Sequence, residues 1–489
     1  MEQIDVLCRF IFECSQTHAE KKLNHVSSSD LLNSIGLNTS CRRSHSEMTE
    51  PRFYNRDMET MSRDELDAMQ LQKLLAMLDY VSKTNPFYAN HWKEAGTDVS
   101  KVKSFDDFRM VPMIEKSHIV ADQEAHPPFG TRSGSINDNL GRTDLYTTSG
   151  TSGQGKELHA CSLRELKAME ELYRYGMAWA GMKPGDIVLL TLPITMLAGG
   201  RVEYQGAVAA DLTVLPVGNY DAETKVDHIR RFNPKALFGS TSYFGTLATV
   251  MGEEARKSGV NTLLTGLEGA SLPFLNSIEE MWGAKAYDRF GCASMRADFM
   301  WSDESGVGKA GAPGSLLNVD PYVLMEVVDP ETGIPVADGE FGELVITSLY
   351  HFDNPVVRNR VRDGAVFQKG GRKGSVRNFH GVEMASISRI DDVKKVKGIN
   401  IYPQAVDDLV FSWPEIEQYE VILTRTESFA DVANLRLQLR SGASDASTDQ
   451  IIARAQTAVK SRLGINFKIE IVPNIEVSDY KARRWKDLR

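Results

Sequence analysis

The 489-residue chain lacks any apolar run of about 18 residues, the length needed to cross a membrane. It also lacks a surplus of positive charge, because 56 lysines and arginines stand against 66 aspartates and glutamates, and the formal net charge is −10. A protein that binds nucleic acid regardless of sequence needs a basic face. The composition therefore excludes that class of nucleic-acid binder, and we expect no membrane span.

Cysteine is scarce, and no pair of cysteines has the spacing of zinc ligands. The five cysteines are odd in number and mostly far apart, at positions 8, 14, 41, 161 and 292. The first residues contain early acidic groups and no cationic start, which makes them a poor secretory signal. A reducing compartment is the simplest setting for such a chain, so we predict a cytoplasmic protein.

What the chain does contain is a dense run of glycine and hydroxyl residues closed by one lysine. Residues 147–157 read Thr-Thr-Ser-Gly-Thr-Ser-Gly-Gln-Gly-Lys-Glu. Glycine lets backbone N–H groups converge on an anion, hydroxyls add rotatable donors, and a lysine adds a point charge. A flexible linker is the alternative, but linkers rarely carry a lysine after such glycine spacing. The run therefore predicts a phosphate cradle formed by Thr148, Ser149, Gly150, Thr151, Ser152, Gly153 and Lys156.

Two known phosphate loops compete for this run. Gly150 and Gly155-Lys156 fit the first seven positions of G-x-x-x-x-G-K-[ST], but Glu157 cannot supply the final hydroxyl and would repel a phosphate. The residues ahead of the run are also not the apolar strand which that loop follows. Thr148 to Gly153 is similar, with one conservative change, to the Thr-Ser-Gly-Thr-Thr-Gly loop of the acyl-adenylate-forming enzymes.

Apolar periodicity indicates an α/β protein. Between residues 163 and 267, helical and strand-like segments alternate with short links, which favours a mostly parallel sheet flanked by helices. Beyond Asp320 the pattern changes to β-hairpin material, and a compact α+β unit follows from about Arg389. The prediction is an N-terminal extension over 1–48, a large domain over 49–388 with a β-rich subdomain, and a small mobile C-terminal domain over 389–489.

Several blocks in fixed order give the chain a family resemblance. They are Pro86-Phe87-Tyr88, the phosphate loop, Asp329-Pro-Glu-Thr-Gly333, Gly339-Glu-Phe-Gly-Glu-Leu-Val345 and Gly398-Ile-Asn-Ile-Tyr-Pro403. From about Arg63 to Arg484 the chain resembles an acyl-adenylate-forming, AMP-binding ligase, most similar to the phenylacetate–CoA ligase branch. This resemblance also favours the acyl-adenylate loop over the G-x-x-x-x-G-K-[ST] loop for residues 148–156.

The resemblance implies a two-step reaction. A carboxylic acid, expected to be aryl or arylacetic, attacks the α-phosphate of ATP in the presence of Mg²⁺, and the thiol of CoA then displaces AMP. An amine or a carrier-protein thiol is the alternative acceptor, and a non-catalytic nucleotide-binding protein is a third possibility. The metal ligands stay unknown from the sequence. The extension over 1–48 is a tethering arm, part of a dimer contact, or disordered, and the sequence does not distinguish these alternatives.

Family positions imply the nucleotide site. Gly269-Ala270-Ser271 corresponds to the adenine-contacting loop, although a plain strand-to-helix turn is an equal alternative. Residues 287–294 match Tyr-Asp-x-Tyr-Gly-x-Ser-Glu, so the resemblance assigns Asp288, Arg289, Phe290 and Gly291 to the nucleotide. Phe290 would stack on adenine or else pack in the core. The departure is Ser294, which stands where the family has a magnesium-binding glutamate; Asp298, Asp303 and Glu304 are the candidates to replace it.

The C-terminal half supplies the remaining positions. Asp363 corresponds to the acceptor for both ribose hydroxyls, within an arginine-rich block in which Asn359 replaces the family's tyrosine. Arg389 would contact ribose or phosphate, Asp391 would be the hinge, and Lys481 would reach the acyl phosphate. Apolar residues that line an acid pocket, or simply form sheet and helix core, are Tyr204, Ala207, Phe238, Tyr243 and Phe244.

Overall fold

The computed structural model describes residues 51–133, 141–148, 156–390, 394–396, 399–401, 403–426, 431–440, 448–475 and 484–489. All of them lie in the compact unit Thr49–Arg489. No helix in these ranges is both long and apolar enough to cross a membrane. The predicted boundary at residues 388 and 389 stays a prediction.

A helical region precedes the phosphate loop. The Ser62 hydroxyl accepts from the Glu65 N–H and the Glu65 side chain accepts from Ser62, which forms a capping box at the start of the first long helix. Asn85 ends that helix and caps the next, because its side chain accepts from the Tyr88 N–H at 3.3 Å. The helices are α2 (Arg56–Glu59), α3 (Arg63–Thr84), α4 (Pro86–Glu94), the 3₁₀ turn η1 (Val99–Lys101), α5 (Phe105–Phe108) and α6 (Lys116–Ala125).

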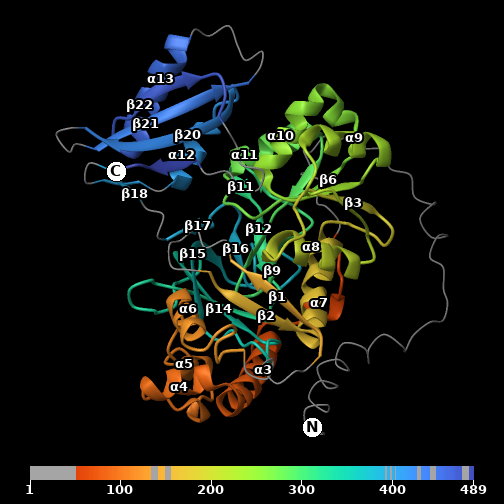
Figure 1. Ribbon diagram of the computed structural model, residues 1–489, viewed down its shortest axis with the longest axis vertical. Coiled ribbons are helices and arrows are strands. Elements are labelled where there is room, and N and C mark those ends of the chain that lie inside the picture. The colour runs from red at the N-terminus through yellow and green to blue at the C-terminus, as the bar shows by residue number, and fades with distance from the viewer. Residues whose placement is uncertain are drawn as a thin grey trace, which may run out of the picture. The chain divides into compact units, whose positions relative to one another are not determined.

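The predicted parallel sheet is present as five strands in the order β4-β3-β5-β6-β7, every pair parallel. Helices alternate with its strands along the chain (Figure 1). The elements are α7 (Leu163–Trp179), β3 (Ile187–Leu190), α8 (Ala198–Ala209), β4 (Thr213–Pro216), α9 (Ala222–Phe232), β5 (Ala236–Phe238), α10 (Thr241–Met251), η3 (Gly252–Lys257), β6 (Thr262–Leu264), α11 (Leu272–Trp282) and β7 (Lys285–Tyr287).

The β-rich region is an eight-stranded sheet in the order β13-β14-β15-β16-β12-β9-β8, with β17 paired to β15. Its predicted hairpin is confirmed, since Val323 to Val328 pairs antiparallel with Ser348 to Glu343. The strands are β8 (Arg289–Cys292), β9 (Ala297–Ser302), β12 (Ser315–Asn318), β13 (Val323–Val328), β14 (Phe341–Ser348), β15 (Asn359–Gln368), β16 (Gly381–Glu383) and β17 (Ser388–Arg389), beside the small pair β10 (Gly308–Lys309) and β11 (Ala312–Pro313).

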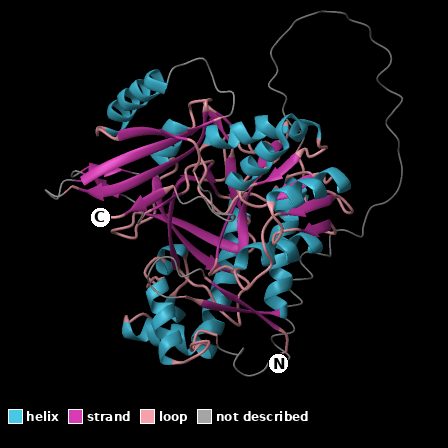
Figure 2. Ribbon diagram, turned by 45° about the horizontal axis from the view of Figure 1, so that its top comes forward, coloured by secondary structure: helices cyan, strands magenta, loops and turns pink. Residues whose placement is uncertain are grey.

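The C-terminal elements form a four-stranded sheet in the order β22-β21-β20-β23, in which helix α13 contacts β22 (Figure 2). This arrangement agrees with the predicted α+β texture. The elements are β18 (Lys394–Val396), β19 (Ile399–Ile401), α12 (Pro403–Val410), β20 (Ile416–Arg425), β21 (Asp431–Leu439), α13 (Thr448–Leu463), β22 (Lys468–Val472) and β23 (Trp485–Asp487).

Candidate active site

A short hairpin closes the ends of the glycine-rich loop. Strands β1 (Thr143–Thr147) and β2 (Leu158–Ser162) pair antiparallel, with Thr147 opposite Leu158. The Thr148 hydroxyl accepts from the Glu157 N–H at 3.0 Å, and the Thr148 N–H donates to the Glu157 carbonyl at 3.1 Å. Lys156 is exposed. Ser149, Gly150, Thr151, Ser152 and Gly153 lie outside the described residues.

Beside the β1–β2 hairpin lies a row of polar contacts that the sequence did not indicate. Arg132 donates to His159 Nδ1 at 2.8 Å, so the ring proton of neutral His159 sits on Nε2. Burial lowers the pKa of His159 to about 4, which keeps the ring neutral. Its Nε2 lies 3.8 Å from Glu157 Oε2, and Lys116 Nζ lies at the same distance from that oxygen. The Glu157 carboxylate, which the sequence suggested would repel a phosphate, therefore forms an ion pair with Lys116.

The Gly269-Ala270-Ser271 segment joins β6 to α11. Ser271 is the N-cap of α11, because its hydroxyl accepts from the Phe274 N–H at 3.3 Å. Gly269 is exposed and Ala270 is buried. The turn lies after a parallel strand, at the edge of the sheet where ligands bind in α/β folds. Its contact with adenine stays a prediction.

Arg289 is enclosed by protein groups. Its guanidinium has no exposed surface and bonds Glu203, the Thr265 carbonyl and Asp298, the last at 2.8 Å from Nε. It also lies over the Phe238 ring, 4.4 Å from the centroid. Arg289 therefore holds the ends of β6 and β8 together, and its contact with the nucleotide stays a prediction.

The neighbouring aspartate is also bound internally. Thr265 donates to Asp288 Oδ1 at 2.8 Å, and the Asp288 N–H donates to Ser302 at 2.8 Å. Burial raises the pKa of Asp288 to about 6. Phe290 is half-buried and meets Phe299 edge-on at 5.7 Å, so it packs on the core while keeping some exposed surface. Its stacking on adenine stays a prediction.

Gly291 has a steric reason to be glycine. A Cβ atom there would lie 2.2 Å from the Ala297 carbonyl oxygen, because β8 and β9 shift register at this point. Any larger residue would therefore push the two strands apart.

The two departures from the family pattern contact each other. Asn359 Nδ2 donates to Ser294 Oγ at 2.9 Å, and both residues are almost fully buried. Cys292 Sγ lies 3.1 Å from the same oxygen, and burial raises the pKa of that thiol to about 11. The Ser294 oxygen is thus already occupied by an amide donor.

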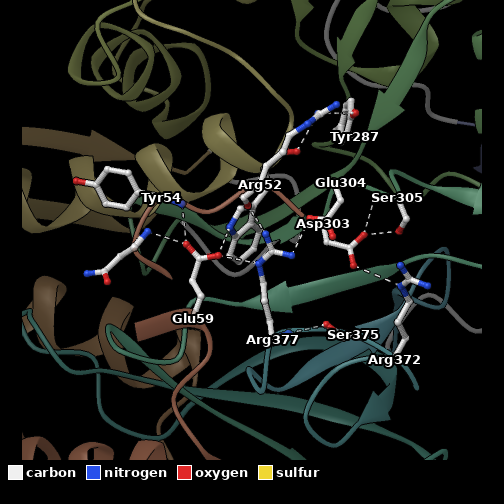
Figure 3. Close-up of polar contacts among 12 residues, drawn as sticks. Arg52, Tyr54, Glu59, Tyr287, Asp303, Glu304, Ser305, Arg372, Ser375 and Arg377 are labelled. Carbon is white, nitrogen blue, oxygen red and sulfur yellow. Dashed lines mark hydrogen bonds and ion pairs between the residues drawn. The ribbon is translucent and has the colours of Figure 1, made fainter. Parts of the chain in front are cut away.

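Each of the three proposed replacement carboxylates accepts hydrogen bonds from protein groups. Asp298 accepts from Arg289 and, at 3.1 Å, from the Tyr173 hydroxyl. Asp303 accepts from the Ser305 N–H at 2.9 Å and pairs with Arg372, while Glu304 accepts from Arg377 at 2.7 Å (Figure 3). No group of three His, Cys, Asp or Glu in the described ranges could hold a metal ion.

Figure 3 shows the polar contacts of Asp303 and Glu304. Arg377 has no exposed side-chain surface and donates to Glu59 at 2.8 Å as well as to Glu304. Arg52 donates to the Tyr287 hydroxyl at 3.2 Å, from the segment just ahead of α2. The cluster therefore fastens residues 52–59 to the end of β7 and the loop after β9.

Asp363 and Arg389 face each other across β15 and β17. The two residues are direct partners in that strand pair, and Arg389 NH1 lies 3.5 Å from Asp363 Oδ2 and 3.2 Å from the Val361 carbonyl. Both side chains keep exposed surface, 38% for Arg389 and 18% for Asp363. A carboxylate and a guanidinium are therefore placed together at the last strand pair before residue 391. Asp391 and Lys481 lie outside the described residues.

The weakly predicted acid pocket is divided by the structure. Ala207, Phe238 and Phe244 have no exposed surface and belong to the core, the alternative that the sequence left open. Tyr243 is nearly buried and accepts from Lys225 Nζ at 2.9 Å, and Tyr204 is half-buried.

A different apolar group lies closer to the phosphate loop. Ile194, Met196 and Leu197 are each between 43% and 50% exposed, and Thr147 bonds the Met196 carbonyl at 2.8 Å. An isolated β-bridge also joins Thr147 to Leu197. Exposed large apolar side chains that lie together often mark a binding site. No sequence motif singled these three out, and they became candidates only when the structure showed them next to Thr147.

Comparisons with known proteins agree over most of the chain. The family of AMP-binding enzymes matches residues 118–352, and the AMP-binding enzyme C-terminal domain matches residues 398–489. A phenylacetate-coenzyme A ligase of Thermus thermophilus is 28% identical, over 89% of this chain and 100% of its own length. The corresponding Escherichia coli ligase is 24% identical, over 88% of this chain and 97% of its own.

Solved structures of 2-hydroxyisobutyryl-CoA ligase match in two different states. The postadenylation state, which holds 2-HIB-AMP, has a TM-score of 0.82 at 27% identity, covering 92% of this chain and 95% of that one. The thioesterification state, which holds 2-HIB-AMP and CoA, has a TM-score of 0.64 at 26% identity with the same coverage. The same relative therefore fits this chain better in one arrangement than in the other.

Proposed function

The chain belongs to the family of AMP-binding enzymes, the acyl-adenylate-forming ligases, and on that premise we propose that it joins a carboxylic acid to the α-phosphate of ATP. Pyrophosphate leaves, and the thiol of CoA then displaces AMP. The observation that carries the proposal is the end-to-end match to a ligase structure holding an acyl adenylate, with a TM-score of 0.82. An unactivated carboxylate is a poor electrophile, and this chemistry needs positioned charges more than covalent help from the protein.

In this proposal the residues have separate tasks. The 148–156 loop holds the phosphates with backbone N–H groups, hydroxyls and Lys156. Asp363 accepts hydrogen bonds from the ribose hydroxyls. Arg389, whose NH1 lies 3.5 Å from Asp363 Oδ2, orients that carboxylate and faces ribose or phosphate. Lys481 neutralises the oxygens of the reacting phosphate, and Asp391 is the point about which the C-terminal domain turns.

The described residues do not fit a protein-held metal ion, because Ser294 Oγ accepts from Asn359 and the nearby acids are engaged in ion pairs. Mg²⁺ offsets phosphate charge in reactions of this kind. Here it would depend on the nucleotide's own oxygens for its ligands.

Ser294→Glu is expected to lower the Mg²⁺ concentration for half-maximal pyrophosphate release by about tenfold, equal to about 1.4 kcal/mol. The new carboxylate can bind the cation and still accept from Asn359, which now donates to Ser294 Oγ at 2.9 Å. Ser294→Gln is the matched control, with similar size and no charge. An equal shift in both variants, or a rise in the Mg²⁺ requirement, would show that position 294 does not face the metal.

The acid is expected to be apolar, aryl or arylacetic, because the exposed Ile194, Met196 and Leu197 lie beside the phosphate loop. Phenylacetate, benzoate, 2-hydroxyisobutyrate and acetate should each be tested for pyrophosphate release with ATP and Mg²⁺. We expect at least tenfold faster release with an aromatic acid than with acetate.

The acceptor is tested in the same reactions by adding CoA, an amine or a carrier protein and weighing the products. A CoA thioester is expected. An amide or an acylated carrier would keep the first step and replace the second. Absence of acid-dependent pyrophosphate release with every acid would refute adenylation and favour a non-catalytic nucleotide-binding protein.

A further inference from the structure

Arg484 is a buried cation three positions after the proposed catalytic lysine in the sequence. It follows Lys481 by three residues and directly precedes β23, where its carbonyl accepts from the Val421 N–H at 2.6 Å. The residue is only 9% exposed. Its backbone is thus fixed to β20, and its side chain is directed away from water.

Three aromatic rings surround the Arg484 guanidinium. Its central carbon lies 4.9 Å from the centroid of Phe411, 5.6 Å from Tyr419 and 5.2 Å from Phe274. Phe411 and Phe274 also stack on each other, with centroids 4.3 Å apart. Phe411 and Tyr419 belong to the C-terminal elements, whereas Phe274 belongs to α11, beside the parallel sheet. One of the three rings is therefore supplied from the other half of the molecule.

Hydrogen bonding alone does not satisfy this arginine. Within the described ranges, Arg484 Nε and NH2 have no hydrogen-bond partner, and its nearest carboxylate oxygen, Asp407 Oδ1, lies 3.6 Å from NH1. That oxygen is already bound by the Tyr419 hydroxyl at 2.7 Å. Aromatic faces stabilise a guanidinium most where water is excluded. The Phe274 ring is therefore an important partner of the Arg484 charge.

Among the residues that the structure describes, a second side-chain contact connects the same two regions. Thr249 on α10 donates to Glu417 on β20 at 3.4 Å, and both groups are exposed. An exposed contact of this kind contributes little. Phe274, in contrast, is 3% exposed in this arrangement. The buried contact of Phe274 with Arg484 and Phe411 therefore has the greater influence on how the C-terminal elements are held.

We propose that Phe274 and Arg484 form a latch that holds the C-terminal domain in the adenylation arrangement and opens for acyl transfer. Arg484 is then a positioning residue for Lys481, not a group that touches the substrate. The inference rests on the proposed function. It agrees with the lower TM-score, 0.64 against 0.82, of the match to the thioesterification state of the 2-hydroxyisobutyryl-CoA ligase.

The kinetic test separates the two half-reactions. Arg484→Met and Phe274→Leu each introduce an apolar side chain close in size to the one replaced. Each variant removes the cation–π contact between the two residues. We expect either variant to slow acyl-AMP formation about tenfold while acyl transfer from preformed acyl-AMP to CoA stays normal or becomes faster. Arg484→Lys should recover part of the loss. Arg425→Met is the matched control, because Arg425 is 52% exposed and pairs with Asp431 within the C-terminal sheet. Equal slowing of both steps would overturn the proposal.

A second test needs no catalysis. Thr249→Cys and Glu417→Cys, introduced after the native cysteines are replaced by serine, place two thiols at the 3.4 Å contact for a short bifunctional crosslinker. We expect crosslinking to slow several-fold when Arg484→Met or Phe274→Leu is added. An unchanged crosslinking rate in both variants would refute the latch. This measurement still reports on the latch if no acid is ever adenylated, so the failure of one proposal is distinguishable from failure of the other.

Discussion

Lys481→Ala is expected to slow acyl-AMP formation by a factor of about 10²–10³, the usual loss when one group that stabilises developing charge is removed. The lysine lies outside the described residues, but Arg484, three residues later, is fixed beside α11. The charge of Lys481 acts mainly in the transition state of the first step. The variant should therefore transfer a preformed acyl group to CoA at close to the normal rate. Pyrophosphate release and thioester formation from synthetic acyl-AMP measure the two steps separately.

Two further variants sharpen this experiment. Lys460→Ala, at an exposed position on α13, removes a lysine from the same domain and should change neither step. Asp391→Pro, which fixes one backbone angle at the proposed hinge, should impair transfer more than adenylation. If Lys481→Ala damaged both half-reactions equally, the lysine would be supporting the fold and the rotation of the domain would lose its basis.

Arg289→Met is expected to reduce the free energy of unfolding by about 3–5 kcal/mol, because it leaves a buried ion-pair network without its cation. Glu203 and Asp298 would then face each other in a site from which water is excluded. Urea denaturation followed by circular dichroism measures the change. The double variant Arg289→Met/Glu203→Gln should regain part of the loss, since it also removes one of the two carboxylates.

The pH dependence of that loss has a definite sign. Burial raises the pKa of Glu203 above its ordinary value in the folded protein, and the neighbouring Asp298 adds to the shift while Arg289 opposes it. A raised carboxyl pKa means that the folded state holds the proton more tightly, so stability falls as pH rises through that pKa. Without Arg289 the deficit should therefore be larger at pH 8 than at pH 5. A deficit independent of pH would mean that lost packing, not charge, is responsible.

Local patterns predicted most of the fold. The Ser-x-x-Glu spacing at Ser62 and Glu65 predicts the start of a helix, and α3 begins there. The pattern of residues 163–179 also predicts a helix, and α7 has those two ends. Such features depend on neighbours within one or two turns, so the sequence contains the necessary information. The alternation that predicts a parallel sheet is likewise a property of consecutive segments.

The site was less accessible because its contacts join distant residues. Arg289 is buried against Glu203, which lies 86 positions earlier, and no local pattern around either residue indicated that pair. Asp303 and Glu304 looked free to bind a metal, but their arginine partners, Arg372 and Arg377, lie 69 and 73 positions away. Hydrophobic periodicity says nothing about which charges will meet.

The hydrogen bond between Asn359 and Ser294 also has an evolutionary meaning. A lineage that exchanged only one of these positions would pass through a protein with a bulky or unsatisfied polar group in a site where both residues are almost fully buried. Such an intermediate is selected against, so the two positions are expected to drift as a pair across descendants of this chain. We therefore expect serine at position 294 to occur together with asparagine at position 359 in related sequences, because each supplies the buried hydrogen-bond partner of the other.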